Sequence, residues 1–241
     1  MVKVAIMGYG VVGSGVAQVL TDHYDSIAGR AKEEIDIKYI LDLRDFPDSP
    51  FQGKFIKDFA VILNDPEVRV VAEVMGGLHP AYDYVKALLE AGKSVVTSNK
   101  ELVAAKGAEL LKIAQEKNVN FLFEASVGGG IPIIRPISQC LAANDVIEIA
   151  GILNGTTNFI LTKMIEEGMD FGDALALATE LGYAEADPTA DIEGLDAGRK
   201  VAIMASIAFH SRVTFDDVYT EGITCFWIIS ARVLDSILMV L

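Results

Sequence analysis

The chain has 241 residues, a hydrophobic content of 51% and a formal net charge of −14 at pH 7. This length and composition allow a sizeable core, with room for a nucleotide-binding domain and a smaller second unit, and they exclude a disordered polypeptide. The acidic charge argues against a nucleic-acid backbone or an anionic membrane surface as a partner, because either would call for a basic face.

Targeting and redox signals point to a cytoplasmic protein. The N-terminal residues MVKVAIMGYG resemble a strand and turn rather than a signal peptide, and no uninterrupted apolar run reaches about 18 residues. The two cysteines, Cys140 and Cys225, lack metal-ligand or CxxC spacing. We therefore expect reduced thiols and no membrane partner.

Strand signals alternate with helical segments through the first half of the chain. The expected strands are Val2–Met7, Ile35–Leu41, Val68–Val74, Ser94–Thr97 and Asn120–Glu124. The expected helices run from about Val11, from Ala81 to Ala91 before a left-handed terminator at Gly92, and over Lys106–Lys117. The alternation predicts an α/β fold with a parallel sheet covered by helices.

The alternation ends after Ser126. The residues GGGIPIIRP form a glycine and proline turn cluster, and Val146–Leu153 is an expected strand. Helices are expected over Phe159–Glu166 and Phe171–Leu181. This change of pattern predicts two domains, over residues 1–125 and 126–241.

Gly8, Gly10 and Gly13 follow the first strand and open a helix, which is the context that a Rossmann dinucleotide fingerprint needs. The pyrophosphate would lie at the helix N-terminus, beside Val11 and Val12, where free N–H groups and the helix dipole favour anions. The alternative is an ordinary strand-to-helix turn.

Asp42 is the best match to the acidic residue expected at the end of the second strand, and Arg44 lies two positions further on. A carboxylate there favours the ribose hydroxyls of NAD, whereas a guanidinium can pair with the 2′-phosphate of NADP. The sequence does not choose between the two cofactors, and either residue can instead be a solvated loop charge.

Two further strands lead into candidate cofactor-binding residues. The strand from Val68 leads into Gly76, and the strand from Ser94 leads into Ser98 and Lys100. Open α/β sheets bind ligands at the carboxyl ends of their strands, so we predict that these residues line the site. The alternative for Lys100 is a surface lysine.

Two other turns carry candidate binding groups. The turn Val127–Pro132 can offer carbonyl oxygens to a monovalent cation, or it is only a glycine-rich turn. In the motif NGTTN, Gly155 and Thr156 bring N–H and hydroxyl groups to the start of a helix, where a substrate carboxylate would fit. An ordinary N-cap is the alternative.

The stretch from Leu181 to Lys200 places five carboxylates ahead of one lysine. They are Glu185, Asp187, Asp191, Glu193 and Asp196. In a helix from Gly194 onward, Asp196 and Lys200 share one face with Ile203 and Ile207. Because the run VAIMASIAF that follows is apolar on nearly every side, we predict that the charged pair lies at the mouth of an enclosed site. The alternative is a solvated salt bridge.

Together, GxGxxG, SNK, EASVGGGIP, NGTTN and GYAEADPTADIEGLDAGRK resemble homoserine dehydrogenase over roughly residues 1–223. The resemblance implies a Rossmann domain that binds a dinucleotide over residues 1–125, a second α/β domain that binds substrate and dimerises over residues 126–241, and a homodimer. It implies the NAD(P)-dependent interconversion of L-homoserine and L-aspartate 4-semialdehyde, in threonine and methionine biosynthesis.

The same resemblance implies roles for individual residues. Lys200 looks like the proton-transfer lysine and Lys100 like a second site lysine. Glu185 and Asp196 are similar to substrate-binding acids, Asp191 to a supporting acid, and Gly182 to a residue lining cofactor and substrate. Backbone atoms of four residues align with a structural sodium site: Glu124, Val127, Gly129 and Ile131.

The residue types suit this chemistry. Hydride delivery to an aldehyde creates an alkoxide, which a cationic lysine can stabilise and protonate, and carboxylates suit a substrate that bears an ammonium group. A 2-hydroxy-acid dehydrogenase would more naturally offer an arginine clamp with a histidine base. An aldehyde dehydrogenase would need a nucleophilic cysteine, and Cys140 and Cys225 lie in no such motif.

After Ile223 the sequence departs from the family pattern. The apolar segment TCFWIISARVLDSILMVL follows, so we expect a shortened catalytic region whose second domain is incomplete at the C-terminus. The alternative function is therefore an inactive cofactor-binding or oligomerisation module. The many large apolar side chains predict that residues 226–241 pack on the substrate domain or on a partner subunit, in a chain that is at least dimeric.

Overall fold

The computed structural model describes residues 1–185 and 187–225. The chain divides into two compact units, Met1–Pro132 and Ile133–Leu241. The domain boundary near residue 125 stays a prediction. Each unit has its own set of packed elements.

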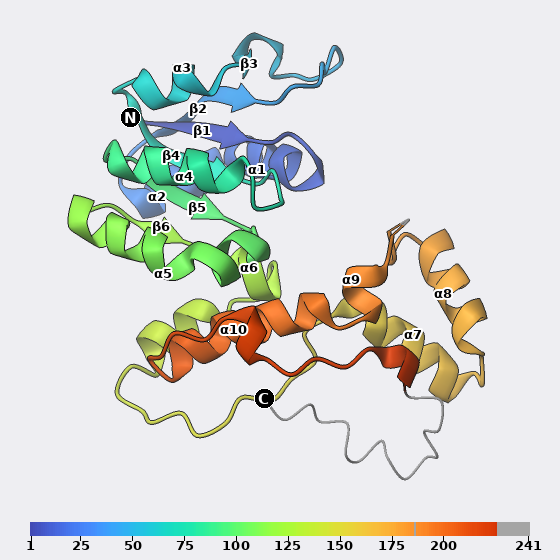
Figure 1. Ribbon diagram of the computed structural model, residues 1–241. Coiled ribbons are helices and arrows are strands. Elements are labelled where there is room, and N and C mark those ends of the chain that lie inside the picture. Colours follow the sequence, from blue (N-terminus) through green and yellow to red (C-terminus); the bar gives the residue numbers. More distant parts are fainter. Residues whose placement is uncertain (186, 226–241) are drawn as a thin grey trace. The chain divides into compact units, whose positions relative to one another are not determined.

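The first unit is built around a parallel sheet. Within the described residues this sheet has six strands, in the order β3-β2-β1-β4-β5-β6 (Figure 1). The strands are β1 (Val2–Met7), β2 (Ile35–Leu41), β3 (Phe55–Ile56), β4 (Val68–Glu73), β5 (Ser94–Thr97) and β6 (Phe121–Leu122). All pairings are parallel. The strand order is that of a Rossmann domain, with the switch point between β1 and β4, and it confirms the predicted fold class.

Helices cover both faces of the sheet (Figure 1). Those of this unit are α1 (Val11–Asp22), α2 (Tyr24–Ala31), α3 (Phe59–Asn64), α4 (Ala81–Glu90), α5 (Lys100–Lys117) and α6 (Ala125–Gly128). On one face, Ala17 of α1 packs among Ile6, Ile40 and Ala72 of the sheet. On the other face, α4 and α5 lie against each other. The apolar strands are thus buried on both sides, as parallel sheets require.

Helix α5 begins at Lys100 rather than at the predicted Lys106. Asn99 is its N-cap, because the Asn99 Oδ1 accepts a hydrogen bond from the Leu102 N–H at 3.0 Å. The helix ends at Asn118, whose φ of 54° is left-handed. The earlier start makes Lys100 the first residue of the helix.

The described residues of the second unit form helices and connecting loops. The helices are α7 (Gly155–Glu166), α8 (Phe171–Glu180), α9 (Thr189–Ile192) and α10 (Leu195–Ala208). A π-helical turn spans Pro136–Cys140, and 3-10 turns span Phe215–Asp217 and Ile223–Cys225. Ile160 of α7 packs against Ala174 and Ala178 of α8 in a local core.

The strand predicted over Val146–Leu153 does not form within the described residues. This segment runs as irregular chain, with an isolated bridge at Ala150 and with the side chains of Ile147 and Ile152 exposed. A strand is stabilised by main-chain hydrogen bonds to a neighbour, and the part of this unit that the structure describes contains no strand beside it.

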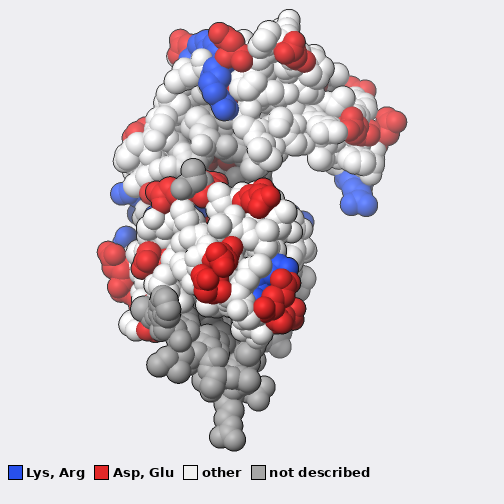
Figure 2. Space-filling view, turned by 90° about the vertical axis from the view of Figure 1, so that its right-hand side faces the viewer, with Lys and Arg blue, Asp and Glu red and all other residues white. Residues whose placement is uncertain are grey.

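The surface carries the acidic charge of the sequence. On the face shown in Figure 2, acidic side chains lie scattered among uncharged ones, and basic side chains occur in small groups. Among the helices of residues 1–185 and 187–225, none has the length and apolar character needed to cross a membrane. The predicted packing of residues 226–241 lies outside the described residues.

Candidate active site

The glycine motif joins β1 to α1 by a close approach of the main chain. A Cβ atom on Gly8, which has a φ of 96°, would lie 2.9 Å from the Val74 carbonyl oxygen. A Cβ atom on Gly13 would lie 1.9 Å from the Gly8 carbonyl oxygen. A Cβ atom on Gly10 would meet no described atom within 4 Å. Gly8 and Gly13 are therefore required by packing, whereas Gly10 leaves open space at the N-terminus of α1, next to the exposed Val11 and Val12.

Asp42 and Arg44 form one hydrogen-bonded group beside this loop. The Asp42 Oδ2 accepts from the Tyr9 N–H at 2.7 Å and from the Arg44 Nη2 at 2.9 Å. The Asp42 Oδ1 accepts from the Arg44 Nε at 3.0 Å and from its backbone N–H at 2.9 Å. The hydrogen bonds from the Arg44 guanidinium lower the pKa of Asp42 to about 2. The Asp42 side chain is 8% exposed and that of Arg44 is 64% exposed.

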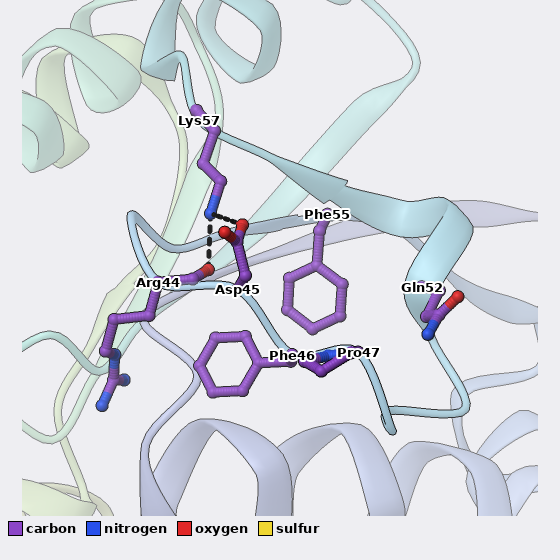
Figure 3. A pocket seen from close by; sticks show the side chains of 7 residues that line it. All are labelled: Arg44, Asp45, Phe46, Pro47, Gln52, Phe55 and Lys57. Carbon is purple, nitrogen blue, oxygen red and sulfur yellow. Dashed lines mark hydrogen bonds and ion pairs between the residues drawn. The ribbon is translucent and has the colours of Figure 1, made fainter.

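A pocket of about 350 Å³ lies next to Arg44 (Figure 3). Its lining residues are Arg44, Asp45, Phe46, Pro47, Gln52, Phe55 and Lys57. The rings of Phe46 and Phe55 stack with their centroids 5.2 Å apart, and the Tyr9 ring packs edge-on against each of them at 4.9 Å. The Lys57 Nζ pairs with the Asp45 carboxylate at 2.9 Å. The aromatic cluster thus joins the pocket to the glycine loop through Tyr9.

The carboxyl ends of β4 and β5 carry a hydrogen-bonded chain that sequence reasoning missed. Glu73 has no exposed surface; its Oε1 accepts from the Met75 N–H at 2.9 Å and its Oε2 from the Thr97 hydroxyl at 2.6 Å. The Thr97 Oγ1 accepts from the Asn99 N–H at 2.9 Å. The Asn99 Nδ2 donates to the Gly77 carbonyl at 2.6 Å. The sequence signal was one acidic residue at the carboxyl end of a strand whose preceding residues, Val70 to Ala72, are apolar.

The predicted residues Gly76, Ser98 and Lys100 lie in the two turns that this chain of hydrogen bonds joins. Gly76 has a φ of 78°, a conformation that favours glycine. Ser98 lies between β5 and the N-cap of α5, and Lys100 opens that helix. All three follow the carboxyl ends of strands, where an open sheet binds its ligand.

The four residues of the expected sodium site lie in and around the one-turn helix α6. Glu124 is its N-cap, Val127 is buried within it, and Gly129 follows it with a φ of 58°. The Ile131 N–H donates to the Gly128 carbonyl at 2.9 Å. The last carbonyls of a short helix have no partners within that helix, so main-chain oxygens gather in this segment.

In the second unit, α10 carries Asp196 and Lys200 on one face. The Lys200 Nζ lies 2.8 Å from the Asp196 Oδ2 and donates to the Leu153 carbonyl at 2.7 Å. The Asp196 side chain is 2% exposed and the Lys200 side chain 14%. The alternative prediction, a solvated salt bridge, therefore does not describe this pair. Ile203, one turn further along α10, is buried as expected.

Asn154, which sequence reasoning did not assign to the site, joins this pair to a second carboxylate. Its Nδ2 donates to the Asp191 Oδ1 at 2.7 Å and to the Asp196 Oδ2 at 2.9 Å. Its Oδ1 accepts from the N–H and the hydroxyl of Thr157, at 2.8 and 3.0 Å, and caps α7. The NGTTN motif is therefore an N-cap and part of a polar cluster at the same time.

Thr156 holds the loop that follows α8. Its hydroxyl donates to the Tyr183 carbonyl at 2.8 Å, and the Tyr183 ring stacks on Phe159 with centroids 4.6 Å apart. This loop carries Gly182, which has a φ of 78°, and the exposed Glu185. Gly155 is the exposed first residue of α7. The structure thus brings Asp191, Asp196 and Lys200 together through Asn154, and it places Glu185 on a separate, exposed loop.

Comparison with known proteins matches both units to one family. Residues 8–124 match the family model described as the homoserine dehydrogenase NAD-binding domain. Residues 132–236 match the model described as homoserine dehydrogenase, so the departure from the family pattern that was expected directly after Ile223 is wrong as far as residue 236.

Individual relatives agree. The homoserine dehydrogenase of Corynebacterium glutamicum is 46% identical over 225 residues, which is 92% of this chain and 51% of the relative. The crystal structure of a homoserine dehydrogenase from Thiobacillus denitrificans has a TM-score of 0.88 and 42% identity, and the match covers 93% of this chain and 53% of that one. A hyperthermophilic archaeal homoserine dehydrogenase in complex with NADPH has a TM-score of 0.77 and 27% identity, with 90% and 75% covered.

The chain spans about half the length of the curated relatives it matches. Within that span, both units match models of the same family, and the first unit has the Rossmann strand order. The chain belongs to the homoserine dehydrogenase family.

Proposed function

We propose that this protein is an NAD(P)-dependent oxidoreductase that interconverts L-homoserine and L-aspartate 4-semialdehyde, in threonine and methionine biosynthesis. The observation that carries the proposal is the buried Asp196–Lys200 pair, joined to Asp191 by Asn154, in a member of this family. A partly buried lysine with a fixed carboxylate partner is the kind of group that acts in proton transfer.

The residues of the glycine loop fit a dinucleotide. Gly10 leaves open space where the N–H groups of α1 begin, and those groups favour an anion such as a pyrophosphate. When bound, the nicotinamide supplies a hydride acceptor or donor. Gly76, Ser98 and Lys100, at the ends of β4 and β5, would contact the nucleotide from the same edge of the sheet.

Lys200 would carry the proton. When the alcohol is oxidised, the hydride leaves its carbon for the cofactor, and the hydroxyl proton passes to the Nζ of a neutral Lys200. In the reverse direction the ammonium stabilises the developing alkoxide and protonates it. The Leu153 carbonyl and Asp196, which lie 2.7 and 2.8 Å from the Nζ, would hold it in place for this step.

The remaining residues would recognise the amino acid. Glu185, Asp191 and Asp196 would bind its ammonium group, because carboxylates pair with cations. Gly155 and Thr156, at the N-terminus of α7, would face its carboxylate, where main-chain N–H groups favour an anion.

We further propose that the cofactor is NADP, with its 2′-phosphate bound by Arg44. Both oxygens of Asp42 already accept hydrogen bonds from Arg44 or Tyr9, so a ribose hydroxyl would have to compete for them. The guanidinium of Arg44 is exposed and extends away from Phe55 and Gln52 in Figure 3. The hyperthermophilic archaeal relative binds NADPH.

Substitution of Arg44 tests this cofactor assignment. Arg44→Ala should weaken NADP binding by roughly 1.5–3 kcal/mol, the scale of a hydrogen bond to a charged group, and leave NAD binding almost unchanged. Lys57→Ala, which removes a second cation from the same pocket but not from Asp42, is the matched control. An equal loss of affinity for NAD and NADP in Arg44→Ala would refute the assignment.

A structural sodium ion and a homodimer complete the proposal. The ion would bind main-chain oxygens around α6, at Glu124, Val127, Gly129 and Ile131. Replacing sodium by choline in the buffer should then lower the thermal stability of the chain. Light scattering at micromolar concentration should return the mass of a dimer, and the mass of a monomer would refute that part.

The activity itself is tested by incubating the full chain with homoserine and either NADP or NAD, and following the absorbance of the reduced cofactor. Turnover that is lost in Lys200→Met supports the proposal. Cofactor binding without turnover in a folded sample would favour the alternative, a non-catalytic cofactor-binding or oligomerisation module.

A further inference from the structure

Glu73 presents a fully buried carboxyl group in the first unit that the proposed chemistry does not use. Its Oε1 accepts from an N–H and its Oε2 from a hydroxyl, so the carboxyl group acts only as an acceptor. The hydroxyl is that of Thr97, whose oxygen also accepts from the Asn99 N–H. The Glu73 carboxyl group thus links donors from two different turns.

The bonds of Glu73 continue into a closed network between two turns. Through Met75, Glu73 fixes the turn after β4; through Thr97, it fixes the turn after β5. Asn99 then donates back to the carbonyl of Gly77, in the turn after β4, and caps α5 through the Leu102 N–H. The two turns are thus held at one spacing by side chains as well as by the β4–β5 pairing.

Packing alone does not explain a carboxyl group at this position. Burying a polar side chain costs free energy that its hydrogen bonds only partly offset, and an apolar side chain would join two buried strands at lower cost. The carboxyl group contributes directional hydrogen bonds, which hold the Met75 N–H and the Thr97 hydroxyl in one orientation each. Both groups belong to the carboxyl edge of the sheet.

We propose that Glu73 is a positioning residue for cofactor binding. Through Thr97 and Asn99, Glu73 holds the turn that carries Gly76 at a fixed position relative to the turn that carries Ser98 and Lys100. Both turns can then contact a dinucleotide without rearranging. The inference rests on the proposed function only in that the ligand is a dinucleotide.

Two substitutions of Thr97 isolate the hydroxyl that links the turns. Thr97→Val keeps the shape of the side chain and removes the hydroxyl, whereas Thr97→Ser keeps the hydroxyl and removes only the methyl group. The Kd for NADPH, measured on the full chain by fluorescence titration, should rise on the order of tenfold in Thr97→Val and in Glu73→Gln. It should change by less than about threefold in Thr97→Ser.

Thr21→Val is a further control, because it removes a hydroxyl that donates to the Ala17 carbonyl in α1, away from the network. Melting curves identify variants that are folded. Amide hydrogen exchange at Met75 and Asn99 reports on these hydrogen bonds directly, and it should become faster in Thr97→Val. The Asn99 N–H loses its acceptor, the Thr97 hydroxyl. The Met75 N–H keeps Glu73 as its acceptor, but Glu73 loses the hydrogen bond from Thr97 that holds it in place. A folded Thr97→Val with the NADPH affinity of Thr97→Ser would overturn the proposal.

None of these measurements depends on turnover, so they give a result even if the proposed enzymatic activity is absent. If the wild-type chain binds NADPH but does not oxidise homoserine with NADP, the affinities of the two Thr97 variants can still be compared. If the wild-type chain binds no dinucleotide, the proposed function fails first. The exchange rates at Met75 and Asn99 then decide whether Glu73 fixes the two turns: unchanged rates in Thr97→Val refute it.

Discussion

Replacing Asn154 should separate two roles of one side chain. Its oxygen caps α7 through Thr157, and its nitrogen donates to the carboxylates of Asp191 and Asp196. Serine also supplies an oxygen that can cap a helix, but it has no amide nitrogen to reach the two carboxylates. Asn154→Ser therefore removes the hydrogen bonds to the two carboxylates and keeps the helix cap, whereas Asn154→Ala removes both.

The magnitudes follow from the contacts. A hydrogen bond to a charged acceptor contributes roughly 1.5–3 kcal/mol, and the two bonds here share one nitrogen, so we expect Asn154→Ser to lower the free energy of unfolding by roughly 2–4 kcal/mol in total. Asn154→Ala should cost about 1 kcal/mol more, the usual effect of removing an N-cap. The kcat should also fall in both variants, because Asp196 would lose a contact that orients it toward Lys200.

Urea unfolding of the two variants and the wild-type chain measures these differences. Asp170→Ala is the matched control, because Asp170 caps α8 through the Asp173 N–H at 3.2 Å and takes no part in the cluster around Lys200. This control should cost about 1 kcal/mol. If Asn154→Ser is as stable as the wild type, or if Asn154→Ala costs no more than Asp170→Ala, the bonds to the two carboxylates contribute nothing and the reasoning fails.

Three further predictions address the site. Lys200→Met should depress kcat by on the order of 10²-fold or more, and a change confined to KM would contradict proton transfer by Lys200. Glu185→Gln should raise the KM for homoserine with little change in kcat, and an unchanged KM would remove ammonium recognition from this residue. Because the pKa of Asp42 falls from 3.8 to about 2 in the folded protein, its pairing with Arg44 stabilises the fold above about pH 4 and loses this effect as the pH falls toward 2. The difference in urea stability between wild type and Arg44→Ala should therefore shrink between pH 6 and pH 2, and a constant difference would exclude the pairing as its source.

Several strands and helices of the first unit follow from local sequence patterns, whereas α2, α3 and β3 were not predicted. The predicted bounds of β1, β2 and β5 match the structure, because each run is rich in apolar residues and is followed by a glycine, aspartate or serine. The start of α5 did not follow, since the cap at Asn99 depends on a side-chain bond that the apolar spacing of the helix does not reveal. The segment Val146–Leu153 has the composition of a strand, but among residues 1–185 and 187–225 no strand lies beside it.

Some contacts of the candidate site could likewise be predicted from local sequence, and others could not. Asp196 and Lys200 are four residues apart on a helix, so their contact could be predicted from spacing alone. Asn154 reaches partners that are 37 and 42 positions away in the chain, and Glu73 reaches Thr97 across 24 positions. Such contacts depend on how the helices and strands pack, and no local pattern in one sequence contains that information.

The contact between Lys200 and the Leu153 carbonyl has a consequence for mutational surveys. The acceptor belongs to a peptide group, so any amino acid at position 153 supplies the same oxygen, and a scan of side chains would score this position as tolerant. An ester in place of the amide between residues 153 and 154 would weaken the acceptor while leaving both side chains intact. The dependence of Lys200 on the main chain would then become measurable at a position where side-chain substitution leaves the acceptor in place.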